Sequence, residues 1–119
     1  MAVMTESVVG DIEMLARSWK RDLEARNLSP RTVRVYTDSV AKLTDYLAAQ
    51  GMPTNVAGIT REHVSAFIAD QLERRSASTA ATRFTGCRVF FGWLVEDGEL
   101  KASPMERMKK PQLPERITD

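Results

Sequence analysis

The sequence predicts an all-α domain of four helices followed by an extended C-terminal segment. Large apolar residues recur at spacings of three and four in four long segments, which places them on one face of a helix. No segment alternates apolar and polar residues for long enough to indicate a strand. A chain of 119 residues can also bury a core without a disulfide or a structural metal.

The first two helices are bounded by residues that cap or break helices. The first is expected to run from about Asp11, as its N-cap, to Arg26. The second begins where Ser29 can cap free backbone N–H groups and Pro30 supplies the φ angle of a first helical position, and it ends at Gly51. The expected buried residues are Ile12, Leu15, Trp19 and Leu23, and then Val33, Tyr36, Val40, Leu43 and Leu47.

A loop with two glycines and a proline leads to the third helix, which Thr60 can cap. The fourth helix is expected to start within residues 76–78 and to stop at Gly98. Phe90 and Trp93 fall beside its apolar stripe, so they either add a packing contact or form a rim against another domain. The expected buried residues are Val64, Phe67, Ile68 and Leu72 in the third helix, and Ala80, Phe84, Cys87, Phe91 and Leu94 in the fourth.

The composition changes after the fourth helix. Residues 99–119 contain three prolines and five basic residues but few large apolar ones. Ser103 can start one short helical turn, after which the later prolines prevent regular structure. The expected organisation is a flexible N-terminus over 1–10, a folded domain over 11–103, and a linker over 104–119 that leads to a further domain of a longer protein.

Composition and charge exclude several classes of protein. The single cysteine, Cys87, excludes an internal disulfide and a cysteine-cluster metal site. No apolar run approaches the ~18–20 residues that cross a bilayer, and the start lacks the pattern of a secretory signal, so a cytoplasmic location is expected. The formal net charge is only +1, from 17 Lys and Arg against 16 Asp and Glu, so the positions of the charges must indicate the partner.

The outward face of the fourth helix carries only small, uncharged residues, where a solvated face would carry Lys and Glu. These residues are Ser78, Thr82, Thr85, Gly86 and Val89. Arg83 and Arg88 flank this strip, and neither has an acidic residue three or four positions away. The strip would therefore let a partner come close between two free positive charges.

The second helix has a comparable outward face, formed by Arg31, Arg34, Val35, Asp38 and Lys42. An arginine near the start of a helix interacts unfavourably with the helix macrodipole, which lowers helix stability by ~0.3–1 kcal/mol per charge. Together with the free backbone N–H groups, however, such arginines form a site that binds phosphates. Two alternatives stay open. Arg34, Asp38 and Lys42 can form a solvated charge ladder, and the small strip of the fourth helix can receive a helix of a protein partner.

Several short motifs occur in a recognisable order. They are Leu28–Val33 with Tyr36, Ile59–Thr60, Ser76–Thr79 with Arg83 and Arg88, Phe90–Phe91, Trp93–Leu94, Gly98, Ser103–Pro104 and Lys109–Pro111. Together they resemble the N-terminal core-binding, or SAM-like, domain of tyrosine recombinases and phage-type integrases, over about residues 10–114. The resemblance implies an orthogonal four-helix bundle that binds duplex DNA with its second and fourth helices and positions a separate catalytic domain.

The resemblance also implies which residues contact DNA. Those that match the family's DNA-facing positions are Arg31, Thr32, Arg34 and Val35, then Ser78, Thr79, Thr82 and Arg83, and Lys109 and Lys110 in the linker. Arg88 is added because it flanks the same strip. The arginines and lysines would neutralise phosphates, while Ser78, Thr79 and Thr82 would lie closest to the groove of the duplex.

Family catalysis requires an Arg, a Lys, a His-x-x-Arg pair, a further His or Trp and a nucleophilic Tyr, all in the separate domain. This chain has one histidine, His63, which is expected to be a solvated or capping residue, and it has no His-x-x-Arg motif. We therefore expect no catalytic residue, cofactor, metal or small-molecule substrate here, no membrane contact, and a parent recombinase that self-associates on DNA. A helix-turn-helix regulator is disfavoured because the expected links exceed the 3–4 residue turn of that motif.

Overall fold

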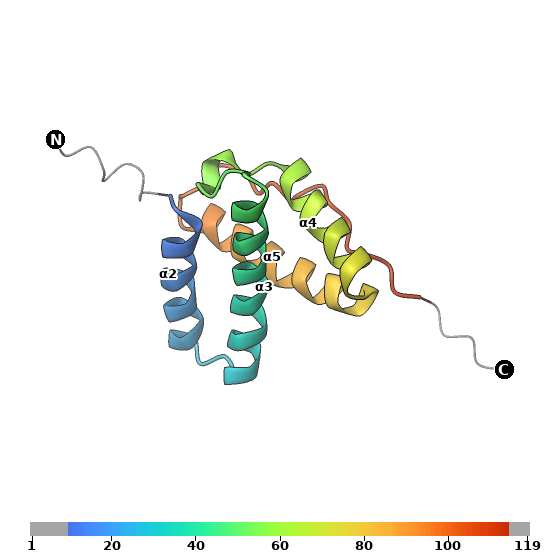
Figure 1. Ribbon diagram of the computed structural model, residues 1–119. Helices are drawn as coiled ribbons and strands as arrows, with labels where there is room; N and C mark the ends of the chain where they lie inside the picture. Colours follow the sequence, from blue (N-terminus) through green and yellow to red (C-terminus); the bar gives the residue numbers. More distant parts are fainter. Residues whose placement is uncertain (1–9, 115–119) are drawn as a thin grey trace.

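The computed structural model describes residues 10–114, and its regular structure is helical throughout. The helices are α2 (Ile12–Ala25), α3 (Pro30–Ala49), α4 (Arg61–Arg74) and α5 (Ala77–Glu96), with one 3₁₀ turn, η1 (Val56–Gly58), before α4. Figure 1 shows this arrangement. The predicted all-α fold is confirmed over the described part of the chain. The expectations for residues 1–9 and 115–119 lie outside it.

The predicted N-caps explain where three of the helices begin. The side-chain oxygens of Asp11, Ser29 and Ser76 accept hydrogen bonds from backbone N–H groups two or three residues later, at 3.0–3.3 Å. Helix α4 starts differently, because Nδ1 of His63 accepts a hydrogen bond of 2.9 Å from the backbone N–H of Thr60. His63 is therefore a capping residue.

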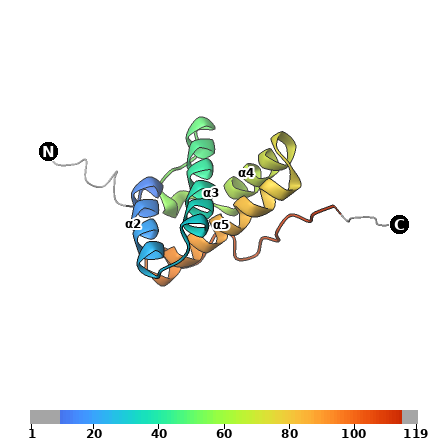
Figure 2. The same ribbon diagram turned by 90° about the horizontal axis from the view of Figure 1, so that it is seen from below.

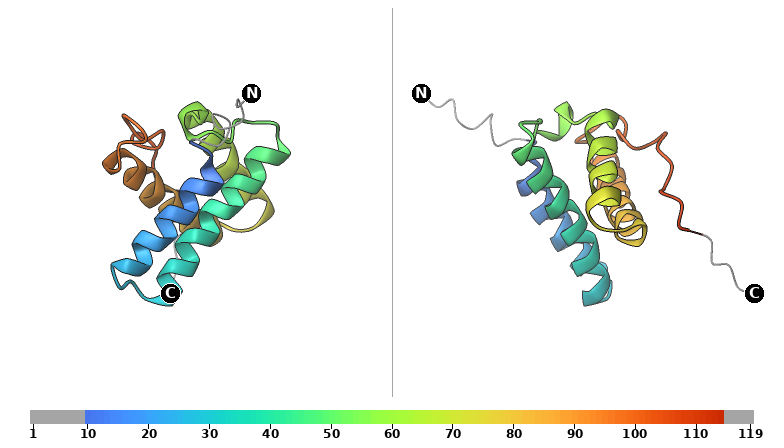
Figure 3. Two further views of the ribbon diagram at one scale, coloured as in Figure 1. Left: turned by 90° about the vertical axis from the view of Figure 1, so that its left-hand side faces the viewer. Right: turned by 45° about the vertical axis from the view of Figure 1, so that its right-hand side comes forward.

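The helices pack in two layers. Helices α2 and α3 lie side by side and antiparallel, and α5 crosses behind both of them (Figures 1 and 3). Helix α4 packs against α5 and against the C-terminal half of α3. Helix α5 thus contacts α2, α3 and α4. The view from below shows α5 as the element that joins the α2–α3 pair to α4 (Figure 2).

Helices α3 and α5 approach each other closely at Gly86. A Cβ atom at this position would lie 2.6 Å from both Cβ and Oγ of Ser39, so no side chain fits there. The thiol of Cys87 donates to the backbone carbonyl of Ser39 beside this contact, at 3.7 Å. Gly86 is therefore buried at a helix crossing, and its predicted place on the outward strip of α5 is wrong.

Aromatic rings fill the core where the two layers meet. The ring of Trp19 stacks on that of Tyr36, with 6.2 Å between centroids, and packs at 5.1 Å against that of Phe90. Phe90 is fully buried, so it is the additional packing contact that the sequence left open, and Trp93 is half-buried against the same core.

The buried face of α4 is turned slightly from the predicted one. Val64, Phe67 and Ile68 are buried as predicted, but the side chain of Leu72 is 44% exposed. Gln71 faces inward instead, at 7% exposure, because the guanidinium of Arg83 on α5 donates a hydrogen bond to its Oε1. A long-range polar contact thus decides which residue of the last turn is buried.

The segment after α5 stays attached to the core. The backbone N–H of Met105 donates to Oγ of Ser103 at 3.0 Å, which confirms the predicted short turn. Met105 is 1% exposed, and Leu100 and Met108 also pack on the core. Residues 101–114 then return along α5 toward its N-terminal end (Figures 1 and 2).

Replacement of Gly86 by alanine tests the helix crossing. Gly86→Ala should lower the free energy of unfolding by about 1–3 kcal/mol, because the new Cβ overlaps Ser39. Gly92→Ala is the matched control on the same helix, since no atom lies within 4 Å of its Cβ position, and it should be neutral or stabilising by up to ~1 kcal/mol. Urea unfolding measures both, and equal effects would contradict the close crossing.

The buried thiol gives a pH prediction. Burial raises the pKa of Cys87 from 9.0 to about 12, with a smaller lowering by the charge of Arg83. The folded chain should not react with a thiol reagent at neutral to mildly alkaline pH, whereas the chain in urea should. Rapid labelling of the folded chain would contradict the burial.

The same burial affects stability. The unfolded thiol ionises above about pH 8.5 while the folded thiol stays protonated, so the free energy of unfolding should fall as the pH rises toward 12. Cys87→Ala should show a shallower fall with pH.

Candidate functional site

A shallow hollow of about 240 Å³ opens where α3 crosses α5. Its lining residues are Val35, Asp38, Ser39, Ser78, Thr79, Thr82 and Arg83. Five of these were predicted as site residues from the sequence, although they come from two segments some forty residues apart. We call this feature the α3–α5 hollow. Its floor is formed by small side chains because the helices meet at Gly86 and Ser39.

The C-terminal segment closes one side of the same region. An adjoining hollow of about 280 Å³ shares Val35, Ser78 and Thr82 with the first and adds Lys110 and Leu113. Residues 109–114 have no regular structure, so the docking of the preceding turn onto the core brings Lys110 to this position. The neighbouring Lys109 is exposed and lines neither hollow.

The two flanking arginines of α5 have different surroundings. Arg83 is half-buried, and its bond to Gln71 of α4 uses one of its donors while the side chain still lines the α3–α5 hollow. The guanidinium carbon of Arg88 lies 5.3 Å from the centroid of the Phe84 ring, on the other side of the helix. Arg88 is exposed but does not line the hollow.

The threonines predicted at the two helix starts have equivalent positions. Thr32 and Thr79 are each the third residue of their helix, and their hydroxyls accept hydrogen bonds from the capping Ser29 and Ser76, at 3.0 and 3.1 Å. Both threonines therefore complete a cap. Thr79 also lines the hollow, whereas Thr32 does not.

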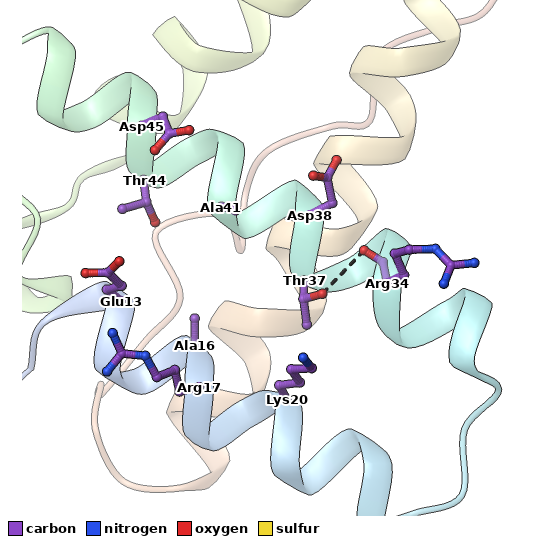
Figure 4. A pocket seen from close by; sticks show the side chains of 10 residues that line it. All are labelled: Glu13, Ala16, Arg17, Lys20, Arg34, Thr37, Asp38, Ala41, Thr44 and Asp45. Carbon is purple, nitrogen blue, oxygen red and sulfur yellow. Dashed lines mark hydrogen bonds between the residues drawn. The ribbon is translucent and has the colours of Figure 1, made fainter.

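Helix α2 contributes positive charges that the sequence analysis missed. A groove of about 410 Å³ between α2 and α3 is lined by three cations, Arg34 together with Arg17 and Lys20 of α2 (Figure 4). Three carboxylates, those of Glu13, Asp38 and Asp45, line the same groove. Arg17 and Lys20 share a stripe with Glu13 and Glu24, at spacings of three and four beside the core face. That stripe was a signal in the sequence, but only the pairing of α2 with α3 shows that it adjoins Arg34.

The cations of this surface form no ion pairs within residues 10–114. The ion pairs there join Arg26 to Asp22, Arg61 to Glu62, and Arg74 to Asp70. None of them involves a predicted site residue. Arg31 and Arg34 are exposed near the start of α3, so their charges remain available to an external anion.

The part of the chain that the structure describes contains no group of three or more His, Cys, Asp or Glu residues that could hold a metal ion. Over the same residues, no helix has the length and the apolar composition that a membrane span needs.

Comparisons with known proteins agree on one family. The profile of the phage integrase N-terminal SAM-like domain matches residues 16–98. The chain is 31% identical over 91 residues to the tyrosine recombinase XerC of Roseiflexus castenholzii, covering 76% of this chain and 29% of that protein. It is 26% identical over 102 residues to XerC of Xanthomonas axonopodis pv. citri, covering 77% and 33%.

A further relative, the tyrosine recombinase XerD of Shewanella oneidensis, is 25% identical over 96 residues, covering 80% of this chain and 31% of that protein. The chain thus spans about a third of the length of the curated relatives that it matches. No solved structure matches it significantly.

The bond between Arg83 and Gln71 predicts a measurable coupling. Arg83→Ala should lower the free energy of unfolding by about 1–2 kcal/mol, because it leaves the buried amide of Gln71 without this partner. The double variant Arg83→Ala/Gln71→Leu should recover part of that loss, since it removes the orphaned polar group as well. Additive losses in urea unfolding would show that the two side chains do not interact.

Proposed function

The chain belongs to the family of phage integrase N-terminal SAM-like domains, and from this premise we propose that it holds duplex DNA against the N-terminal halves of α3 and α5. The domain would position the catalytic domain of a tyrosine recombinase on its target. The relatives XerC and XerD carry the name of tyrosine recombinases, which supports this assignment.

The α3–α5 hollow is the observation that supports the proposal most strongly. Short uncharged side chains, Val35, Ser78 and Thr82, line it from both helices, so the backbones can come close to a bulky partner. Exposed cations that lack ion pairs within residues 10–114 lie near it, Lys110 in the adjoining hollow and Arg34 in the α2–α3 groove with Arg17 and Lys20. Short side chains beside cations that are free to bind phosphate fit the groove of a duplex between its two phosphate backbones, although Asp38 also lines the hollow.

The proposed contacts divide into two kinds. Arg31, Arg34, Arg88, Lys109 and Lys110 would neutralise phosphates, and Arg17 and Lys20 would extend this positive surface along α2. Arg83 would contact DNA through the N–H groups of its guanidinium that are not bonded to Gln71. Ser78, Thr79 and Thr82 would lie closest to the groove, together with Thr32 and Val35. Their short side chains favour contacts to phosphate and close packing over selective base readout.

The strand-cutting chemistry would belong to another part of a longer protein, and this chain would bind DNA without cutting it. We propose that the parent protein is a cytoplasmic recombinase that self-associates on DNA. Its catalytic arginine, histidines and tyrosine would then lie in the remaining two-thirds of a chain as long as the relatives.

Salt dependence tests the proposal directly. The chain should bind a short duplex with a Kd on the order of 10⁻⁴–10⁻⁶ M, because the DNA contacts of the separate catalytic domain are absent from it, and the affinity should fall steeply with salt. Arg34→Ala should reduce the slope of log K against log [salt] by about 0.9, since it removes one phosphate contact. Fluorescence anisotropy with a labelled duplex measures both quantities.

Arg61→Ala is the matched control, because Arg61 is also exposed but lies at the start of α4 and pairs with Glu62. It should leave the slope unchanged. A shallow salt dependence of the unaltered chain would favour the alternative function, a helical module that binds a protein partner through the same small residues.

A further inference from the structure

One carboxylate lies in the middle of the surface that we assign to DNA. Asp38 lines both the α3–α5 hollow and the α2–α3 groove, so it stands on the ridge of α3 between them. It is exposed, and its neighbour Ser39 makes the close contact with Gly86. Asp38 is thus held next to the point where the two helices cross.

Within residues 10–114, the carboxylate of Asp38 forms no hydrogen bond or ion pair. Arg34 and Lys42 lie one turn before and after it, but neither forms an ion pair with it among the described residues, so the charge ladder considered from the sequence does not form. In Figure 4 the carboxylate points away from Lys20 and from the guanidinium of Arg34. Since none of residues 10–114 donates to it, its acceptor sites are available to an external donor.

A carboxylate on a DNA-facing surface repels phosphates and lowers the affinity for every sequence alike. Its chemistry suits a hydrogen-bond donor on a base edge, and the donors in the major groove are the amino groups of cytosine and adenine. The major-groove edge of adenine presents the N7 acceptor beside the amino group, and N7 repels a second carboxylate oxygen. The major-groove edge of cytosine carries no acceptor beside N4 on the same base. The short residues Val35, Ser78 and Thr82 beside Asp38 allow the close approach that its short side chain requires.

We infer that Asp38 accepts a hydrogen bond from the N4 amino group of a cytosine in the major groove and makes the domain prefer a C·G pair at one position. The inference rests on the proposed function, since it requires that duplex DNA bind this face. It assigns sequence preference to an acidic residue that repels the phosphate backbone.

Binding to a pool of randomised duplexes tests the inference. The unaltered 119-residue chain should enrich cytosine at one position by about fivefold or more, the lower end of the range for a specific base contact. Asp38→Ala should lose this preference and bind the unselected pool more tightly. Asp38→Asn should shift the preference toward adenine, because an amide presents both a donor and an acceptor.

Asp45→Ala is the matched control, because Asp45 is an exposed acid two turns further along the same face of α3 that lines the α2–α3 groove but not the α3–α5 hollow. It should raise the affinity for the pool and keep the cytosine preference. The inference is overturned if the chain binds the pool without any preference, or if Asp38→Ala keeps it. Absence of duplex binding by the unaltered chain would overturn the proposed function itself.

Discussion

The close crossing of α3 over α5 determines the geometry of the candidate site. Gly86 leaves no room between its backbone and Ser39, so the helices meet where a side chain would normally separate them. This contact brings Val35 of α3 beside Ser78 and Thr82 of α5. A wider crossing would keep the same helices and caps but would separate these residues. The floor of the hollow therefore depends on one position without a side chain.

The charges around this floor come from elements that are distant in sequence. Lys20 lies on α2, Arg34 on α3 and Lys110 on the C-terminal segment, and the described part of the chain supplies none of them with an ion pair. Arg83 differs because it also holds the buried amide of Gln71. Its substitution would therefore change folding and binding together, whereas substitution of Arg34 would change binding alone. Most cations of the site therefore have no contact with the core, whereas Arg83 also holds a buried side chain in place.

The helices and their starts could be predicted because their causes are local. Apolar spacing identified the core, and Ser29 and Ser76 identified two N-caps. Helix faces could not be predicted where a distant partner decides them. Leu72 is exposed because Gln71 is held by a side chain twelve residues later, and Gly86 is buried because Ser39 approaches it from another helix. The contribution of α2 to the positive surface was missed for the same reason.

The central claim is that one face, formed where α3 crosses α5, receives the duplex. Amide chemical shifts of the ¹⁵N-labelled chain, recorded as a duplex is added, test this claim residue by residue. The account predicts that the largest changes fall within residues 31–38 and 78–83 and near Lys110, while the first turn of α4 around Arg61 stays unaffected. Changes concentrated on α4, with residues 78–83 unperturbed, would contradict it.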